Sequence, residues 1–271
     1  MAIGCRDLAL ACVESLGAEC YQSVKWALEE GYRHIDTAEW YENEAECGRA
    51  IRDWLAENPT AKRQDIFYTT KLMVNIDYDH ALVAMNASVD ISGLGYVDLY
   101  LIHGPQPTKE ARLASWKACQ EGVRLGWVRS IGVSNFGNHH FNEILEAGGP
   151  APCTVNQIDL HPFMRREALV QHQRSHGVLL EAWGPLARGK RMNHPVILEV
   201  AKKHNKTAAQ VFLRWGLQQG YSVIPKSVKH ERIVENKGCF GWQLDKDDLA
   251  KLDVLDEHLV TDWDPSDDAW A

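Results

Sequence analysis

Three polar side chains close short apolar segments, and a fourth lies in the loop after one of them. Together they could transfer a proton. Asp36, Lys71 and His103 each close such a segment, and Tyr41 follows Asp36 by five residues. A phenol is a weak acid at neutral pH, but a buried ammonium beside it favours the phenolate and lowers the phenol pKa. We therefore predict that Tyr41 is a proton donor whose pKa is lowered by Lys71.

The other two residues complete this predicted donor. Asp36 would keep the Lys71 ammonium charged and in place, because an unpaired buried ammonium loses its proton or its position. His103, as a neutral imidazole, would hold a carbonyl oxygen beside the Tyr41 hydroxyl. Taken singly, these residues could instead be a helix cap, a loop anchor, a solvated strand end and a core histidine. Their joint position favours catalysis.

The segments that must position these side chains alternate between short apolar runs and longer amphipathic stretches, which is typical of βα units. We predict strands at residues 33–35, 66–70, 97–102, 128–132, 154–158, 178–181 and 222–224, with a first strand in the opening residues. We predict helices at residues 20–30, 44–57, 79–92, 109–121, 138–147, 167–176, 195–204, 207–219 and 231–237. This order predicts a single (β/α)8 TIM barrel domain over residues 1–271, whose strands carry the site at their carboxyl ends.

Composition and charge argue against several classes of protein. The chain has 271 residues, a formal net charge of −8 and 45% hydrophobic residues, which is typical of a globular protein and unfavourable for non-specific nucleic-acid binding. It shows neither a signal-peptide core nor an apolar run long enough to span a membrane. The seven cysteines are scattered without a Cys-x-x-Cys pair, against a zinc site or a disulfide framework. We expect a cytoplasmic protein with reduced thiols and no metal.

The segments around the four candidate residues resemble the signatures of the aldo-keto reductase family. Residues 31–38 read Gly-Tyr-Arg-His-Ile-Asp-Thr-Ala and precede Tyr41, and residues 97–103 read Val-Asp-Leu-Tyr-Leu-Ile-His. The resemblance covers nearly the whole chain and implies a barrel that reduces an aldehyde or ketone with NADPH. The catalytic residues that it implies are Asp36, Tyr41, Lys71 and His103.

The resemblance also implies where the nicotinamide of NADPH/NADP+ binds. Ser134, Asn135 and Gln157 match residues that hydrogen-bond the carboxamide, and Trp183 takes the position of a stacking aromatic ring that is often Tyr. The same segment continues with Pro185 and Leu186. A Gly-x-Gly-x-x-Gly loop after an early strand is absent, so the dinucleotide would bind without a Rossmann turn.

A second group near the C-terminus resembles the family's adenosine 2′-phosphate and adenine site. Its members are Lys226, Ser227, Val228, Arg232, Glu235 and Asn236. Two cations and a hydroxyl around one anion suit a phosphate, which a guanidinium can bind through two hydrogen bonds. NADPH is therefore favoured over NADH.

Two departures from the family concern the substrate pocket and the N-terminus. Gly104 follows His103 where the family often has Trp, which would widen the pocket, and Trp40 would fill part of that space. The tail at residues 260–265 could fold over the mouth as a specificity loop. We therefore assign Trp40, His103 and Gly104 to the site of a small-molecule carbonyl substrate. Only 35 residues precede Asp36, so we expect the family's N-terminal hairpin to be missing. The resemblance and the lack of an obvious apolar interaction stripe predict a monomer.

Two other functions fit parts of this pattern. A barrel lyase could use Lys71 as a Schiff-base nucleophile, but this leaves Lys226 and Arg232 without a role. A nucleotide-binding sensor or structural barrel could keep the fold and the nucleotide site with little turnover. The four intact candidate residues argue against that second alternative.

Two histidine pairs also invite a metal-site interpretation. His172 and His176 stand four residues apart on a predicted helix, but no Glu accompanies them, so we expect a surface pair. His139 and His140 begin another predicted helix, and we expect both to face solvent.

Overall fold

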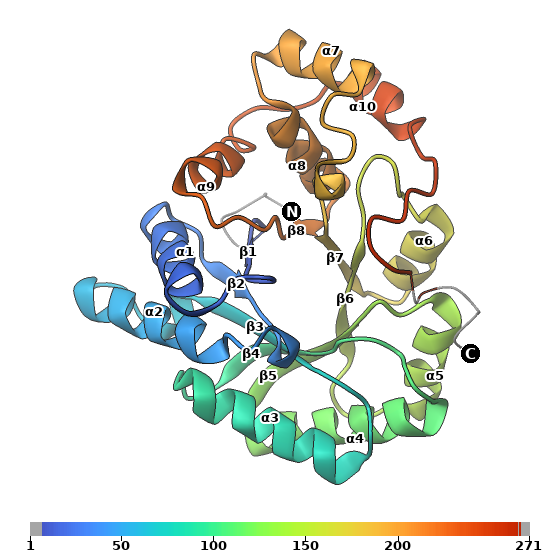
Figure 1. Ribbon diagram of the computed structural model, residues 1–271. Helices are drawn as coiled ribbons and strands as arrows, with labels where there is room; N and C mark the ends of the chain where they lie inside the picture. Colours follow the sequence, from blue (N-terminus) through green and yellow to red (C-terminus); the bar gives the residue numbers. More distant parts are fainter. Residues whose placement is uncertain (1–6, 265, 267–271) are drawn as a thin grey trace.

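The computed structural model, which describes residues 7–264 and 266, is a ring of parallel strands surrounded by helices (Figure 1). Adjacent strands pair in parallel in chain order. Isolated bridges from Leu8 to Val223 and from Ala11 to Lys226 join the first strand region to the last, so the predicted (β/α)8 barrel is confirmed. The strands are β1 (Leu10–Ala11), β2 (His34–Asp36), β3 (Phe67–Leu72), β4 (Val97–Ile102), β5 (Val128–Ser134), β6 (Cys153–Asp159), β7 (Leu179–Trp183) and β8 (Ser222–Val223).

The helices pack around the outside of this ring, and local signals explain several of their ends (Figure 1). The side chains of Asp77 and Thr108 accept backbone N–H groups at the starts of α3 and α4, and left-handed Gly93 and Gly126 end these two helices. The helices are α1 (Gly17–Glu29), α2 (Glu44–Glu57), α3 (Tyr78–Ser92), α4 (Lys109–Leu125), α5 (Asn138–Ala147), α6 (Glu167–Ser175), α7 (Pro195–His204), α8 (Ala208–Gln218), α9 (His230–Lys237) and α10 (Lys246–Asp253), with short 3-10 turns η1 (Glu39–Tyr41), η2 (Arg63–Asp65) and η3 (Ala187–Gly189).

Two predicted helix boundaries differ from the structure by three or four residues, and α10 was not predicted. Helix α1 begins three residues earlier than expected, and α4 continues to Leu125. Helix α10 starts with a capping box in which Asp245 and Asp248 each accept the other's backbone N–H. This spacing of acidic residues is a start signal that the sequence already carries.

The alternation of side chains along the strands places the candidate residues inside the barrel. On β3, Phe67 packs with the interior cluster of Leu99, Leu101 and Val155, whereas Tyr68 belongs to the outer core between strands and helices. Because side chains on a strand alternate between its two faces, Lys71 points to the same side as Phe67. The same alternation along β4 directs His103, the residue after Ile102, into the barrel.

The opening of the chain bears on one further expectation. Strand β1 lies in the opening residues as predicted and pairs with β2. Residues 1–6, on which the predicted loss of the hairpin depends, lie outside the described residues. In the part of the chain that the structure describes, no helix is long and apolar enough to cross a membrane.

Candidate active site

A buried ion pair forms the base of the candidate site. Lys71 on β3 donates from Nζ to Asp36 Oδ1 at the end of β2 over 2.6 Å, and to the backbone oxygen of Thr37 over 2.8 Å. Both charged side chains are at most 1% exposed. A buried charge pair persists only where further hydrogen bonds satisfy it, and here Gln157 Nε2 donates to the second oxygen of Asp36 over 2.8 Å.

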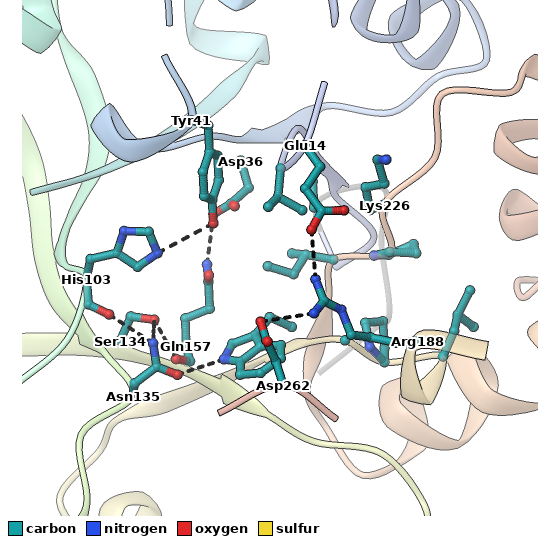
Figure 2. Close-up of a pocket in the computed structure, with 18 of the residues that line it drawn as sticks. Glu14, Asp36, Tyr41, His103, Ser134, Asn135, Gln157, Arg188, Lys226 and Asp262 are labelled. Atoms are coloured by element: carbon teal, nitrogen blue, oxygen red, sulfur yellow. Dashed lines mark hydrogen bonds and ion pairs between the residues drawn. The ribbon is translucent and has the colours of Figure 1, made fainter. Parts of the chain in front are cut away.

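Tyr41 and His103 lie close to Asp36, and the Tyr41 hydroxyl points toward the His103 ring (Figure 2). Tyr41 is the last residue of η1, and its hydroxyl lies 3.5 Å from His103 Nε2. The Lys71 ammonium lies 5.0 Å from the centre of the Tyr41 ring. The structure thus brings together the four predicted catalytic residues, which come from three successive βα units.

Burial dominates the protonation of these groups. It raises the pKa of Tyr41, and the nearby Lys71 ammonium only partly opposes this rise. The prediction of a lowered Tyr41 pKa is therefore wrong in direction, because desolvation of the phenolate outweighs the attraction of Lys71. Burial disfavours the charge on Lys71, but Asp36 and Tyr41 outweigh it and raise the Lys71 pKa.

The imidazole of His103 is neutral at physiological pH, as predicted. Burial first, and the Lys71 charge second, lower the pKa of His103 to about 3. Within the described residues, its Nδ1 has no hydrogen-bond partner. A neutral ring with Nε2 aimed at the Tyr41 hydroxyl can donate to an oxygen placed between the two.

These residues line one side of a cavity of about 1130 Å³ that opens at the carboxyl ends of the strands. Fifteen of the predicted site residues line it, and Lys71, Ser227 and Val228 do not. Lys71 lies beneath the floor because it is fully buried. Because both Tyr41 and Lys226 line it, the cavity extends from the predicted catalytic residues to the segment after β8.

The residues predicted to hold the nicotinamide form a bonded cluster at the cavity wall. Asn135 donates from Nδ2 to the His103 backbone oxygen over 2.9 Å and to Ser134 Oγ over 3.1 Å. Its Oδ1 accepts from Trp183 Nε1 over 2.9 Å. Gln157 Nε2 donates to Asp36 Oδ2 and to Glu181 Oε1, and no described residue donates a hydrogen bond to its amide oxygen. The fixed Trp183 ring offers a flat face to the cavity.

The residues predicted to hold the 2′-phosphate lie at the other end of the cavity. Lys226 and Arg232 line the cavity and are exposed, and neither has an ion-pair partner among the residues that the structure describes. The Ser227 hydroxyl instead caps the turn before α9 through the backbone of Lys229. Two unpaired cations on one rim fit an anionic group.

The substrate end of the cavity has aromatic walls from two distant segments. Trp40 is 62% exposed, and its ring centre lies 6.3 Å from that of His103. Trp263, from the tail, also lines the cavity. A Cβ atom added to Gly104 would lie 3.3 Å from Trp263 Cη2, so the small residue leaves room for the indole of the tail. Pro265, the end of the predicted specificity loop, lies outside the described residues.

Sequence reasoning missed two features of this site. Glu181 is buried inside the barrel on β7, accepts from Gln157 Nε2 over 2.5 Å and lies 3.9 Å from His34 Nδ1. An acidic residue within an apolar strand was the available signal. Arg188 spans the cavity to Glu14 at 3.2 Å and to Asp262 at 3.0 Å (Figure 2), a pairing between loops that no spacing in the sequence indicates.

The histidine pairs lie away from the cavity. The rings of His172 and His176 are 4.8 Å apart, and His172 Nε2 bonds Asn142 Oδ1 over 2.8 Å on the outer side of the barrel. His140 is fully buried against Phe136. The expectation that His140 faces solvent is wrong because α5 packs this side of its first turn onto the strand end.

Comparisons with known proteins indicate the family to which the chain belongs. Residues 16–257 match the model of the Aldo/keto reductase family. An uncharacterized oxidoreductase of Schizosaccharomyces pombe is 44% identical over 247 residues, covering 91% of this chain and 88% of the relative. A glyoxal reductase of Bacillus subtilis is 40% identical over 243 residues, covering 89% and 85%. The crystal structure of a Bombyx mori aldo-keto reductase in complex with NADP has a TM-score of 0.86 at 33% identity, covering 94% of this chain and 90% of that one.

Proposed function

Because this chain belongs to the aldo-keto reductase family, we propose that it reduces an aldehyde or ketone to the alcohol with NADPH and that Tyr41 is the general acid. One observation carries the proposal. The Tyr41 hydroxyl, His103 Nε2 and the buried Asp36–Lys71 pair converge at one end of a cavity whose other end carries the cations Lys226 and Arg232. This arrangement supports proton delivery at a fixed distance from an anion-binding rim.

The cavity fits NADPH by the chemistry of the groups that line it. The flat ring of Trp183 would stack on the nicotinamide, and the free amide oxygen of Gln157 would accept from its carboxamide. Arg232 and Lys226 would bind the 2′-phosphate, for which charged bidentate contacts are strong. When bound, the cofactor supplies the hydride that reaches the carbonyl carbon.

The protein's own residues would act on the carbonyl oxygen. His103 Nε2 would donate a hydrogen bond to that oxygen and hold it beside Tyr41. Its low pKa keeps His103 neutral, so it orients the oxygen without competing as an acid. The raised pKa of Tyr41 keeps the phenol protonated until the oxygen gains negative charge. As the proton leaves Tyr41, the ammonium of Lys71 would stabilise the phenolate.

The Schiff-base alternative is disfavoured by the surroundings of Lys71. A nucleophilic lysine must be neutral and must reach the substrate. Lys71 is fully buried and paired with Asp36, and its pKa is raised. The ammonium form is therefore stabilised where a lyase would need the free amine.

Initial rates of NADPH oxidation with a panel of aldehydes and ketones, including glyoxal, would test the proposal. We expect turnover by the wild type and a loss of roughly 10²–10⁴-fold in kcat for Tyr41→Phe, the usual contribution of a general acid. Quenching of protein fluorescence by NADPH should be unchanged in this variant, which shows that its site is intact. Near-normal turnover by Tyr41→Phe would refute the acid role. Tight NADPH binding by the wild type without turnover would favour the sensor alternative.

The substrate assignment follows from the same cavity. Trp40 and Trp263 give it two aromatic walls beside His103, which suits a carbonyl compound with an apolar substituent. A single domain, a monomeric state and a cytoplasmic location stay predictions from the sequence.

A further inference from the structure

Three cysteine thiols meet in the interior, behind the strand end that carries Asp36. The sulfur atoms of Cys12, Cys20 and Cys47 all lie within 4.8 Å of one another, and those of Cys20 and Cys47 are 3.5 Å apart. All three residues are at most 1% exposed. They are separated widely in the sequence, so only the fold gathers them.

Three different elements hold these sulfurs. Cys12 follows β1, whereas Cys20 and Cys47 each occupy the fourth position of α1 and α2, respectively. Cys20 and Cys47 therefore both lie at the end of the first turn of their helices.

The loop that covers the cluster is fixed by hydrogen bonds. Asn43 Nδ2 donates to the backbone oxygens of Cys12 and Ser15, each over 2.8 Å, and the Cys12 N–H donates to the Asp36 backbone oxygen over 2.9 Å. Val13 and Leu16 of this loop line a shallow recess at the surface. These hydrogen bonds hold the backbone around the thiols in a set arrangement, and the loop that covers them lies at the surface.

The spacing and type of these atoms suit a small thiophilic cation. An ion in the centre of three sulfurs, with bonds of about 2.3 Å, sets the sulfurs roughly 4 Å apart. The distances in the cluster bracket this value. Three soft sulfur ligands select ions such as Cu(I) over hard cations.

A tetrahedral zinc site fits less well. Within the described residues no fourth His, Cys, Asp or Glu joins the three thiols. The nearby hydroxyls are engaged, since Ser15 donates to the Cys12 oxygen and Thr37 donates to Asn43. A three-coordinate ion needs no fourth ligand.

We propose that Cys12, Cys20 and Cys47 form a binding site for one thiophilic d10 cation of the Cu(I) type. Binding breaks three S–H bonds and forms three metal–sulfur bonds, and three protons leave to the solvent, with no change of oxidation state.

An anaerobic titration with Cu(I) in competition with the chelator bicinchoninate would test this site. We expect the wild type to retain one equivalent against the chelator. Cys20→Ser and Cys47→Ser should each lose affinity by more than the roughly 10- to 100-fold caused by changes outside the ligand set. Cys239→Ser, a buried thiol outside the cluster, is the matched control and should keep the equivalent.

X-ray absorption of the Cu(I)-loaded wild type gives a second readout that does not depend on a variant folding. Three sulfur neighbours at about 2.3 Å are expected. A wild type that yields its Cu(I) to the chelator, a site with two sulfur neighbours, or an equivalent that survives in both Cys20→Ser and Cys47→Ser would each overturn the proposal.

Discussion

The two ends of the cavity are built in opposite ways. At the catalytic end, Asp36 and Lys71 are buried and bonded to each other. At the other end, which we propose as the phosphate end, Lys226 and Arg232 are exposed and have no ion-pair partner in the described part of the chain. The first region is held by bonds inside the protein, whereas the second offers its charges to a ligand.

This difference predicts which property of the protein a substitution changes at each end. Changes at the catalytic end should affect folding as well as turnover, because they leave a buried group without its partner. Changes at the phosphate end should affect ligand binding alone, because the side chains there support nothing else.

Removing Lys71 should have the largest effect on stability. Lys71→Met leaves the buried Asp36 carboxylate without its ammonium, which typically costs about 3–5 kcal/mol in the free energy of unfolding. Urea denaturation of the variant and the wild type measures this. The double variant Asp36→Leu/Lys71→Met is the control and should recover part of the loss. If Lys71→Met were as stable as the wild type, folding would not depend on the buried pair and the proposed difference between the two ends would be wrong.

Removing Arg232 should weaken NADPH binding without touching the fold. Arg232→Ala should cost roughly 1.5–3 kcal/mol of binding free energy, the range for hydrogen bonds to charged groups. NADH lacks the 2′-phosphate, so its Kd should barely change. Lys237→Ala, on the same helix but paired with Glu30, is the control. Equal losses for NADPH and NADH would place the phosphate elsewhere.

The neutral His103 should make stability depend on pH. Its folded pKa is about 3, below the usual value of about 6.5, so the unfolded chain binds a proton first as pH falls. This contribution is full above pH 6.5 and is lost progressively down to about pH 3. By pH 5 the loss amounts to about 2 kcal/mol in the free energy of unfolding.

The contribution of His103 to stability can be measured from the unfolding free energies of the wild type and His103→Gln at pH 7 and pH 5. The wild type should lose about 2 kcal/mol more than the variant on acidification. The surface variant His172→Gln is the matched control. Identical losses in the wild type and His103→Gln would show that His103 is not held neutral.

The smallest effect is expected at the bridge across the mouth. Arg188 pairs with Glu14 and Asp262 at the surface, and exposed pairs contribute at most about 1 kcal/mol. The unfolding free energy of Arg188→Ala should therefore fall by less than about 1 kcal/mol, and by less still in high salt. A loss comparable to that of Lys71→Met would show that the bridge is structural.

The sequence by itself determined the barrel and the strand ends. Alternating apolar runs and amphipathic stretches require βα units, and period-two alternation then aims Asp36, Lys71 and His103 to one side of the sheet. The cations Lys226 and Arg232 were recognisable because their segment resembles the family's 2′-phosphate site and because two cations beside a hydroxyl suit one anion. Such patterns extend over a few residues, so they can be recognised without knowing which segments pack against them.

Tertiary structure decided what depends on distance between remote segments. It set the net direction of the Tyr41 pKa, since burial outweighs the charge of Lys71. It also placed Trp263 against Gly104 and gathered three thiols that the sequence scatters. Desolvation and contact depend on which side chains the fold packs together, and no spacing along the chain fixes those distances.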